Sequence, residues 1–170
     1  SYGTTDFREG AVELAQPDGS HITDFCYVSH EIVAGKPKLP GLPATYVEAD
    51  DEADTLLVRL RDEKTGVELV LSYTIFRDFD AIARNAYFVN KGSETVALTR
   101  AMSLAIDLPD ADYDFVQFSG WWGRERQKSV THLRPGIQSI GSLRGQSSHV
   151  HNPFFILKRP QADEQQGEAI

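Results

Sequence analysis

The feature that most constrains this fold is a strand–turn–strand pattern in the middle third of the chain. In 67–75, apolar side chains occupy every second position: Val67, Leu69, Leu71, Tyr73 and Ile75. A period of two is that of a β-strand with one face turned towards a core. The preceding residues 62–66, with the sequence DEKTG, have the composition of a turn. We therefore expect a β-hairpin here.

The segment before this turn, 49–60, fits two patterns. Helical spacing is met by Ala53, Leu56, Leu57 and Leu60. Strand spacing is met as well, with Leu56, Val58 and Leu60 on an inward face and Leu57 outward. We favour the strand, because the segment that follows needs an antiparallel partner.

Similar short segments recur along the chain at intervals of about 8–12 residues. Predicted strands cover 11–14, 22–33, 82–89, 95–108 and a buried 154–157, with turns at 17–20, 77–80, 90–93 and 160–168 and a proline-rich extended loop at 35–43. We expect 11–14 and 22–33 to form a hairpin across the turn at 17–20. The pattern predicts an all-β fold, an antiparallel β-sandwich with little or no helix.

Length and charge narrow the classes of function. A chain of 170 residues suits a single domain, 1–170, with a real core. The net charge of −8 argues against a nucleic-acid partner, because phosphates attract basic surfaces. No apolar run approaches the roughly 20 residues that span a bilayer, and no signal-peptide pattern opens the sequence, so we expect no membrane partner. The lone Cys26 is expected to be buried in a reducing, cytoplasmic compartment.

The stretch 117–155 has the composition of a binding surface presented by loops. It holds both tryptophans, Trp121 and Trp122, together with four arginines and three histidines among Gly, Ser and Asn. An indole offers a flat face to C–H groups, and a guanidinium forms paired hydrogen bonds with neighbouring oxygens. These residue types favour a polar ligand with an apolar face, and sugars fit that description.

Three other groups of residues have a chemical and a plainer interpretation. Asp107, Asp110, Asp112 and Asp114 lack the pattern of a calcium loop, and a solvated acidic turn is favoured. His149 and His151, with His132, could bind zinc, but histidines bonding loop carbonyls are commoner. Glu125 lies between Arg124 and Arg126, which should lower its pKa and favour a structural ion pair. We find no convincing pair of carboxyl groups for glycoside hydrolysis, and expect no metal or cofactor.

Several motifs, in order, resemble the N-terminal domain of bacterial glycoside hydrolase family 36 α-galactosidases. They are YGTTDFR at 2–8, DGS at 18–20, YVSH at 27–30, GKPKL at 35–39, GLPATY at 41–46, SGW at 119–121, RER at 124–126, GIQS at 136–139, SLRGQSSH at 142–149 and NPF at 152–154. The set spans essentially the whole chain. Trp122 and Cys26 depart from the family's usual residues.

The resemblance implies a β-supersandwich of the galactose-mutarotase type that precedes a catalytic (β/α)8 barrel. The two catalytic aspartates would lie in that barrel, beyond residue 170, and would hydrolyse terminal α-linked galactose from melibiose- or raffinose-type galactosides with retention. It also implies a homo-oligomer, a tetramer or a dimer, in which loops of this domain reach a neighbouring active site. No cofactor or metal is implied, and this fragment alone is expected to be inactive.

The resemblance assigns sugar-contacting roles by position in the motifs. Asp6 and Arg8 are the first candidates, Trp121 and Arg124 the second, and His149 and Asn152 the third. Asp6 and Arg8 could instead form an ion pair that fixes the first strand, and Trp121 could instead fill an interdomain seam. Two alternatives to the accessory domain of an α-galactosidase remain: a free-standing carbohydrate-binding module and a purely structural sandwich.

Overall fold

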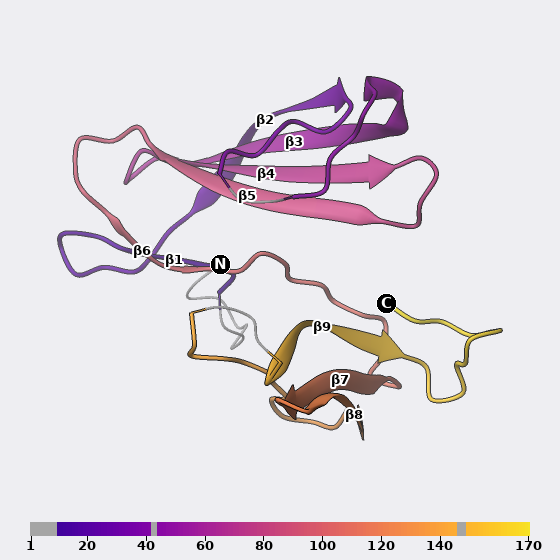
Figure 1. Ribbon diagram of the computed structural model, residues 1–170. Helices are drawn as coiled ribbons and strands as arrows, with labels where there is room; N and C mark the ends of the chain where they lie inside the picture. Colours follow the sequence, from indigo (N-terminus) through magenta and orange to yellow (C-terminus); the bar gives the residue numbers. More distant parts are fainter. Residues whose placement is uncertain (1–9, 42–43, 146–148) are drawn as a thin grey trace. The chain divides into compact units, whose positions relative to one another are not determined.

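The computed structural model describes residues 10–41, 44–145 and 149–170, and their regular secondary structure is almost entirely β-strand (Figure 1). The elements are β1 (Val12–Ala15), β2 (Phe25–Ala34), a 3-10 turn η1 (Asp50–Glu52), β3 (Ala53–Asp62), β4 (Val67–Phe76), β5 (Ile82–Asn90), β6 (Ala97–Ala101), β7 (Asp114–Trp121), β8 (Arg124–His132) and β9 (His151–Lys158). Every strand pair is antiparallel. The predicted all-β class, an antiparallel sandwich with very little helix, is confirmed.

The contacts of the chain separate into two compact units, one within 1–106 and one within 107–170. The first unit holds a four-stranded sheet in the order β2-β3-β4-β5 and the two-stranded pair β1-β6. The second holds a three-stranded sheet in the order β8-β7-β9. That 1–170 forms a single domain stays a prediction.

The central pairings of the four-stranded sheet are regular. β3 and β4 pair without a break from Ala53 opposite Phe76 to Arg61 opposite Glu68, and β4 pairs as evenly with β5. The predicted hairpin across 62–66 is thus confirmed. The strand interpretation of 49–60 is also correct, although its first residues form the 3-10 turn η1. An unbroken pairing of this kind gives a stiff surface on which other segments can be placed.

The interior of the first unit lies at the ends of these strands. Val67, Leu69 and Val70 on β4 are buried, and Leu14 of β1 is 1% exposed. Ile75, which the alternation assigns to the buried face, is instead exposed. Which side chains of β4 are buried therefore depends more on what packs against each end of the strand than on the alternation of residues along it.

Two predictions for the first unit are wrong. β1 pairs with β6, from Val12 opposite Ala101 to Ala15 opposite Ala97, and β2 pairs with β3, so 11–14 and 22–33 form no hairpin. The turn at 17–20 does form, closed by a 2.9 Å bond from the Gly19 N–H to the Gln16 carbonyl. The strand predicted over 95–108 is only β6, because that is the part opposite β1.

Exposure corrects two further predictions. Cys26 is exposed, because β2 is an edge strand of its sheet and this side chain points to solvent rather than to a core. Phe154 and Phe155 of β9 are about half exposed rather than buried. Each still stacks on one phenylalanine of β7, Phe154 on Phe118 at 5.4 Å and Phe155 on Phe115 at 5.3 Å between ring centroids.

A buried carboxylate closes the β3–β4 hairpin. Asp62 is 2% exposed and accepts hydrogen bonds from the Asp24 N–H at 2.7 Å, the Thr65 N–H at 2.8 Å and the Thr65 hydroxyl at 3.0 Å. Burial by itself raises the pKa of Asp62, but these hydrogen bonds outweigh it and hold the pKa below the ordinary 3.8. The hydrogen bonds of the turn therefore stabilise the charged form of the Asp62 carboxyl group.

The second unit is closed by a cluster around Arg159. Its guanidinium lies 4.0 Å from the centre of the buried Tyr113 ring and bonds Asp110 at 2.6 Å and Glu168 at 3.0 Å. The Tyr113 hydroxyl donates to Glu168 at 2.8 Å. The predicted acidic turn before β7 thus has basic partners: Asp110 on Arg159, and Asp114 on Lys158 and His132. The predicted polar turn over 160–168 lies at the other end of this cluster.

The ammonium group of Lys158 organises the turn after β9. It donates to the carbonyls of Arg159, Pro160 and Ala162 at 3.1–3.2 Å and lies 3.6 Å from an Asp114 carboxylate oxygen. Three carbonyl dipoles of a single turn therefore converge on one positive charge.

Among the described residues, no helix is long and apolar enough to cross a membrane.

Candidate functional site

The stretch 117–155 contains strands as well as loops, and its tryptophans lie at the tip of the β7–β8 hairpin. Trp121 pairs with Arg124, so only Trp122 and Gly123 form the turn. Gly123 has a φ of 79°, a conformation that glycine adopts without steric cost. The Gly123 N–H donates to Glu125 Oε1 at 2.7 Å and so fixes the turn from the β8 side.

A β-bulge lies directly behind the tip. The pairing of β7 with β8 shifts between Ser119 and Trp121, so that Gly120 faces two residues of β8. A Cβ at Gly120 would lie 2.3 Å from the Arg124 carbonyl oxygen, so only glycine fits there. Arg126, in the bulge, has a φ of 56°, which is uncommon for a residue other than glycine. Bulges of this kind often redirect side chains beside functional sites.

The other edge of β7 is irregular at the same level. Its pairing with β9 shifts between Gln117 and Ser119, and Ser119 lies opposite His151. The Gly120 N–H donates to the Val150 carbonyl at 3.2 Å. The start of β9 is in this way brought beside the hairpin tip.

Together these irregularities form an open hollow of about 410 Å³. Its walls come from all three strands and the turn before β9: Ser119, Gly120, Trp121, Arg124, Gln127, Val150 and His151. Trp121 is 60% exposed and offers an indole face, and Arg124 and Gln127 supply hydrogen-bond donors. An aromatic wall beside amide, guanidinium and imidazole groups suits a hydroxyl-rich ligand.

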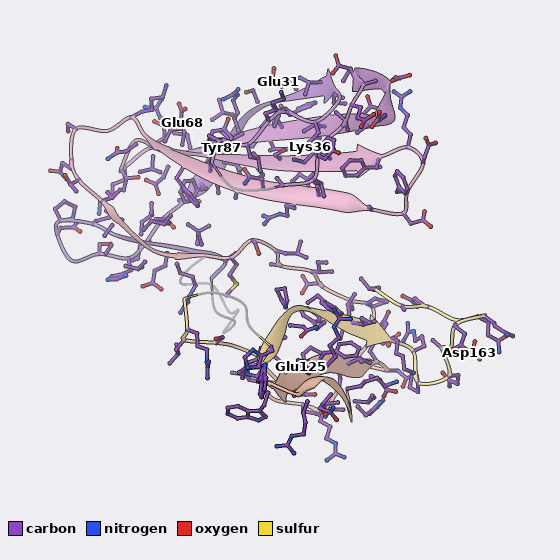
Figure 2. All side chains as sticks on the ribbon, in the orientation of Figure 1. Glu31, Lys36, Glu68, Tyr87, Glu125 and Asp163 are labelled. Carbon is purple, nitrogen blue, oxygen red and sulfur yellow. The ribbon has the colours of Figure 1, made fainter. Side chains whose placement is uncertain are left out.

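Glu125, labelled in Figure 2, is the second residue of β8 and is not among the residues that line the hollow. Its pKa is lowered, as predicted, but the cause is different. The hydrogen bond from the Gly123 N–H is the main cause, and the hydrogen bond from the N–H of Glu125 itself acts in the same direction. A carboxylate held in its charged form is a poor general acid.

The remaining predicted residues have separate positions. His149 is exposed in the turn before β9. Asn152 lines a neighbouring hollow of about 520 Å³ with Phe154 and the segment 140–145, and His151 lines both hollows. Asp6 and Arg8 lie outside the described residues. Trp121 and Arg124 are thus the predicted pair that the structure brings together.

The zinc interpretation gains no support from the geometry. His132, at the end of β8, is bonded to Asp114 at 3.1 Å. Within the described ranges, no group of three or more His, Cys, Asp or Glu side chains is placed to hold a metal ion.

Sequence reasoning missed the contributions of Gln127 and His151 to the hollow. His151 is named there only as a metal ligand, and Gln127 is not singled out. The sequence signal that could have found Gln127 is the Trp122–Gly123 dipeptide, which suits a two-residue hairpin turn. Such a turn places the residues after it, Gln127 among them, on a strand beside β7.

The family model of the glycosyl hydrolase family 36 N-terminal domain matches residues 1–170. The chain belongs to this family. α-Galactosidase AgaA of Geobacillus stearothermophilus is 48% identical over 168 residues, which is 99% of this chain and 23% of AgaA. α-Galactosidase C of Emericella nidulans is 45% identical over 98% of this chain and 22% of its own length. The chain therefore spans less than a quarter of the length of these relatives.

The fold agrees with solved members of the family. The crystal structure of AgaA matches 99% of this chain and 24% of AgaA with a TM-score of 0.96 and 47% identity. Structures of AgaA variants in complex with raffinose and with stachyose match with a TM-score of 0.95. These relatives are α-galactosidases, and the chain corresponds to their N-terminal domain.

Proposed function

We propose that this chain is the non-catalytic N-terminal domain of an α-galactosidase that releases terminal galactose from raffinose-type oligosaccharides. The observation that carries this proposal is the match of the entire chain, in sequence and in fold, to AgaA. The hydrolysing carboxyl groups belong, on this proposal, to a catalytic barrel that follows residue 170.

The hairpin tip helps to shape the sugar pocket of the assembled enzyme. Trp121 provides a stacking face, and Arg124 and Gln127 provide donors to sugar hydroxyls. Trp122 is 88% exposed at the outermost point of the turn, where a second subunit or the enzyme's own barrel would cover it. A homo-oligomer that uses this tip as an anchor is part of the proposal.

The two neighbouring tryptophans allow a matched test in the full-length enzyme. Trp121→Ala removes the wall of the hollow, whereas Trp122→Ala removes the neighbouring, more exposed indole, which is not among the residues that line it. We expect Trp121→Ala to raise KM for raffinose about fivefold or more with a smaller change in kcat, because one stacking contact is lost. Trp121→Phe should restore most of the affinity.

Equal KM values for Trp121→Ala and the unmodified enzyme would contradict the role of the tip. A larger effect of Trp122→Ala, accompanied by a change in oligomeric state on size-exclusion chromatography, would assign the tip to assembly instead.

A second measurement separates the accessory domain from a free-standing binding module. Residues 1–170 expressed alone should show no hydrolysis of a chromogenic α-galactoside, while the full-length protein hydrolyses it. Turnover by 1–170 would overturn the proposal. Binding of raffinose to 1–170 that is lost with Trp121→Ala would favour the binding module.

A further inference from the structure

The first unit contains a larger cleft that the proposed function does not use. It measures about 740 Å³ and lies between residues 36–40 with 44–45, which form its covering segment, and one face of the four-stranded sheet. A volume of this size is typical of sites for small molecules. Figure 2 labels Lys36 on the covering segment and Tyr87 on β5, which both line it.

The covering segment is anchored where it leaves the sheet. The Gly35 N–H donates to the Ala53 carbonyl at 2.7 Å, and the Gly35 carbonyl accepts from the Thr55 hydroxyl, also at 2.7 Å. Thr55 is buried and pairs with the buried Thr74 at 2.8 Å. Pro37 and Pro40 then restrict the backbone above the cleft. The cleft is therefore largely formed before any ligand arrives, which reduces the entropy lost on binding.

The floor of the cleft is a row of side chains across three strands. Leu57 of β3 pairs with Ser72 of β4, and Ser72 pairs with Asn85 of β5, so all three share one face. Tyr87 lies one step further along the same face of β5 and supplies an aromatic wall. Ser and Asn are unfavourable in the middle of strands, so this row gains little for the sheet itself.

The polar groups of the cleft are available to a ligand. Among the described residues, the side chains of Ser72 and Asn85 have no hydrogen-bond partner, and Lys36 and Lys38 have no acidic partner. By contrast, Arg59 on the same face is already paired with Glu31 at 3.2 Å. The free groups therefore combine hydroxyl and amide donors with two ammonium groups.

The charge of the cleft is opposite to that of the chain. The protein has 25 acidic against 17 basic side chains, yet the described residues that line the cleft include Lys36, Lys38 and Arg84 and no carboxylate. Arg84 alternates with Asn85 along β5, so its side chain lies on the opposite face of the sheet, where it lies 5.4 Å from the Tyr73 ring and bonds the Ser103 carbonyl. The two lysines are thus the groups that can meet an anion, and a recessed cleft of one sign concentrates ions of the other sign.

We propose that this cleft binds a phosphorylated monosaccharide, with the phosphate on Lys36 and Lys38 and the sugar ring between Tyr87 and the Ser72–Asn85 row. Ammonium groups bind phosphate as point charges. The hydroxyl and amide groups of the floor match sugar hydroxyls, and the tyrosine ring matches the C–H face of a sugar. The inference does not depend on the proposed function.

The test is calorimetric titration of the full-length protein with glucose 6-phosphate, glucose 1-phosphate and galactose 1-phosphate, and with inorganic phosphate and glucose as comparisons. The experiment is run with saturating galactose, so that any site for free galactose elsewhere in the protein is occupied. We expect at least one sugar phosphate to bind about tenfold more tightly than inorganic phosphate, and its affinity to fall as salt rises. Glucose alone should bind too weakly to detect.

Matched variants assign the binding to the cleft. Lys36→Gln/Lys38→Gln should weaken binding about tenfold or more, because both charges on the phosphate are lost. Lys64→Gln removes the same kind of charge from a lysine that instead pairs with Asp18, and should leave binding unchanged. Tyr87→Ala should weaken sugar-phosphate binding but not binding of inorganic phosphate. Raffinose hydrolysis should be unaltered in all three variants, so this result and that of the tryptophan test are independent.

Each other outcome overturns the proposal. Binding that persists in Lys36→Gln/Lys38→Gln would lie elsewhere in the protein. If inorganic phosphate bound as tightly as the sugar phosphates, the cleft would be an unspecific anion site. If glucose bound as tightly as the sugar phosphates, the cleft would be a site for neutral sugars. No detectable binding of any sugar phosphate would mean that the cleft takes no such ligand.

Discussion

The four-stranded sheet and the three-stranded sheet differ most in the regularity of their central strands. β4 pairs evenly on both sides, whereas β7 shifts its pairing on both sides near Ser119. The regular sheet ends in a turn fixed by the buried Asp62, and the irregular one ends in a tip with two exposed indoles. The regular pairing of the four-stranded sheet gives a stiff surface, whereas the two shifts in the pairing of β7 direct side chains into a hollow.

The largest effect should come from breaking the regular sheet at Asp62. Asp62→Ala removes the acceptor of three hydrogen bonds and leaves the Asp24 and Thr65 N–H groups unsatisfied. We expect a loss of about 3 kcal/mol in the free energy of unfolding, measured by thermal or urea denaturation. An unchanged midpoint would show that the turn does not depend on this carboxylate.

Asp62→Asn adds a pH test to the same site. Because the folded pKa is below 3.8, the stability due to the charge is complete above that pH and is lost as the pH falls through the folded value. The difference in Tm between the unmodified protein and Asp62→Asn should therefore be constant near neutral pH and shrink below about pH 3.8. A difference that grows towards acid would contradict the lowered pKa.

An intermediate effect is expected when the irregular sheet is changed at Gly120. The added Cβ of Gly120→Ala would meet the Arg124 carbonyl oxygen and the Glu125 Cα, so the bulge must shift. We expect a loss of about 1–3 kcal/mol in stability and a raised KM for raffinose in the full-length enzyme. Gly123→Ala is the control, because a Cβ there meets nothing within 4 Å although its φ of 79° still adds strain. It should lower stability by about 1 kcal/mol, through backbone strain alone.

The smallest of these effects should come from Arg159→Lys in the second unit. Lysine keeps the charge but loses the fork that bonds both Asp110 and Glu168. The hydrogen bond from Arg159 lowers the pKa of Asp110, so part of this stability is lost in acid. We expect a fall in Tm smaller than that of Asp62→Ala, and no change in KM. A larger fall would make the cluster around Arg159, and not the regular sheet, the main support of the chain.

The sequence predicted the elements whose information is local. The alternation at 67–75 and the DEKTG turn sufficed for the β3–β4 hairpin, because strand and turn signals lie within about twenty residues. The pairing of β1 with β6 joins Val12 to Ala101, and no periodic pattern records which distant strand will be the partner. The same limit explains Cys26, since alternation does not tell which strand becomes an edge.

The candidate site was predicted in part for a similar reason. Composition indicated the stretch 117–155 as a binding surface, within which the family resemblance singled out Trp121 and Arg124. It could not identify His151, which comes to the hollow only through pairing of β9 with β7. The lowered pKa of Glu125 was predicted with the wrong cause. A hydrogen bond from a backbone N–H depends on the shape of the turn, and residue types alone do not indicate it.

The turn after β9 has a consequence for the conditions the protein tolerates. Lys158 places a positive charge among three carbonyl oxygens, an arrangement that in many loops is completed by a calcium or sodium ion. Here the cation is the ammonium group of Lys158, which is part of the chain, so its presence at the carbonyl oxygens does not depend on the ions in the solvent. The end of the second unit should therefore keep its shape in chelating buffers and in media poor in salt.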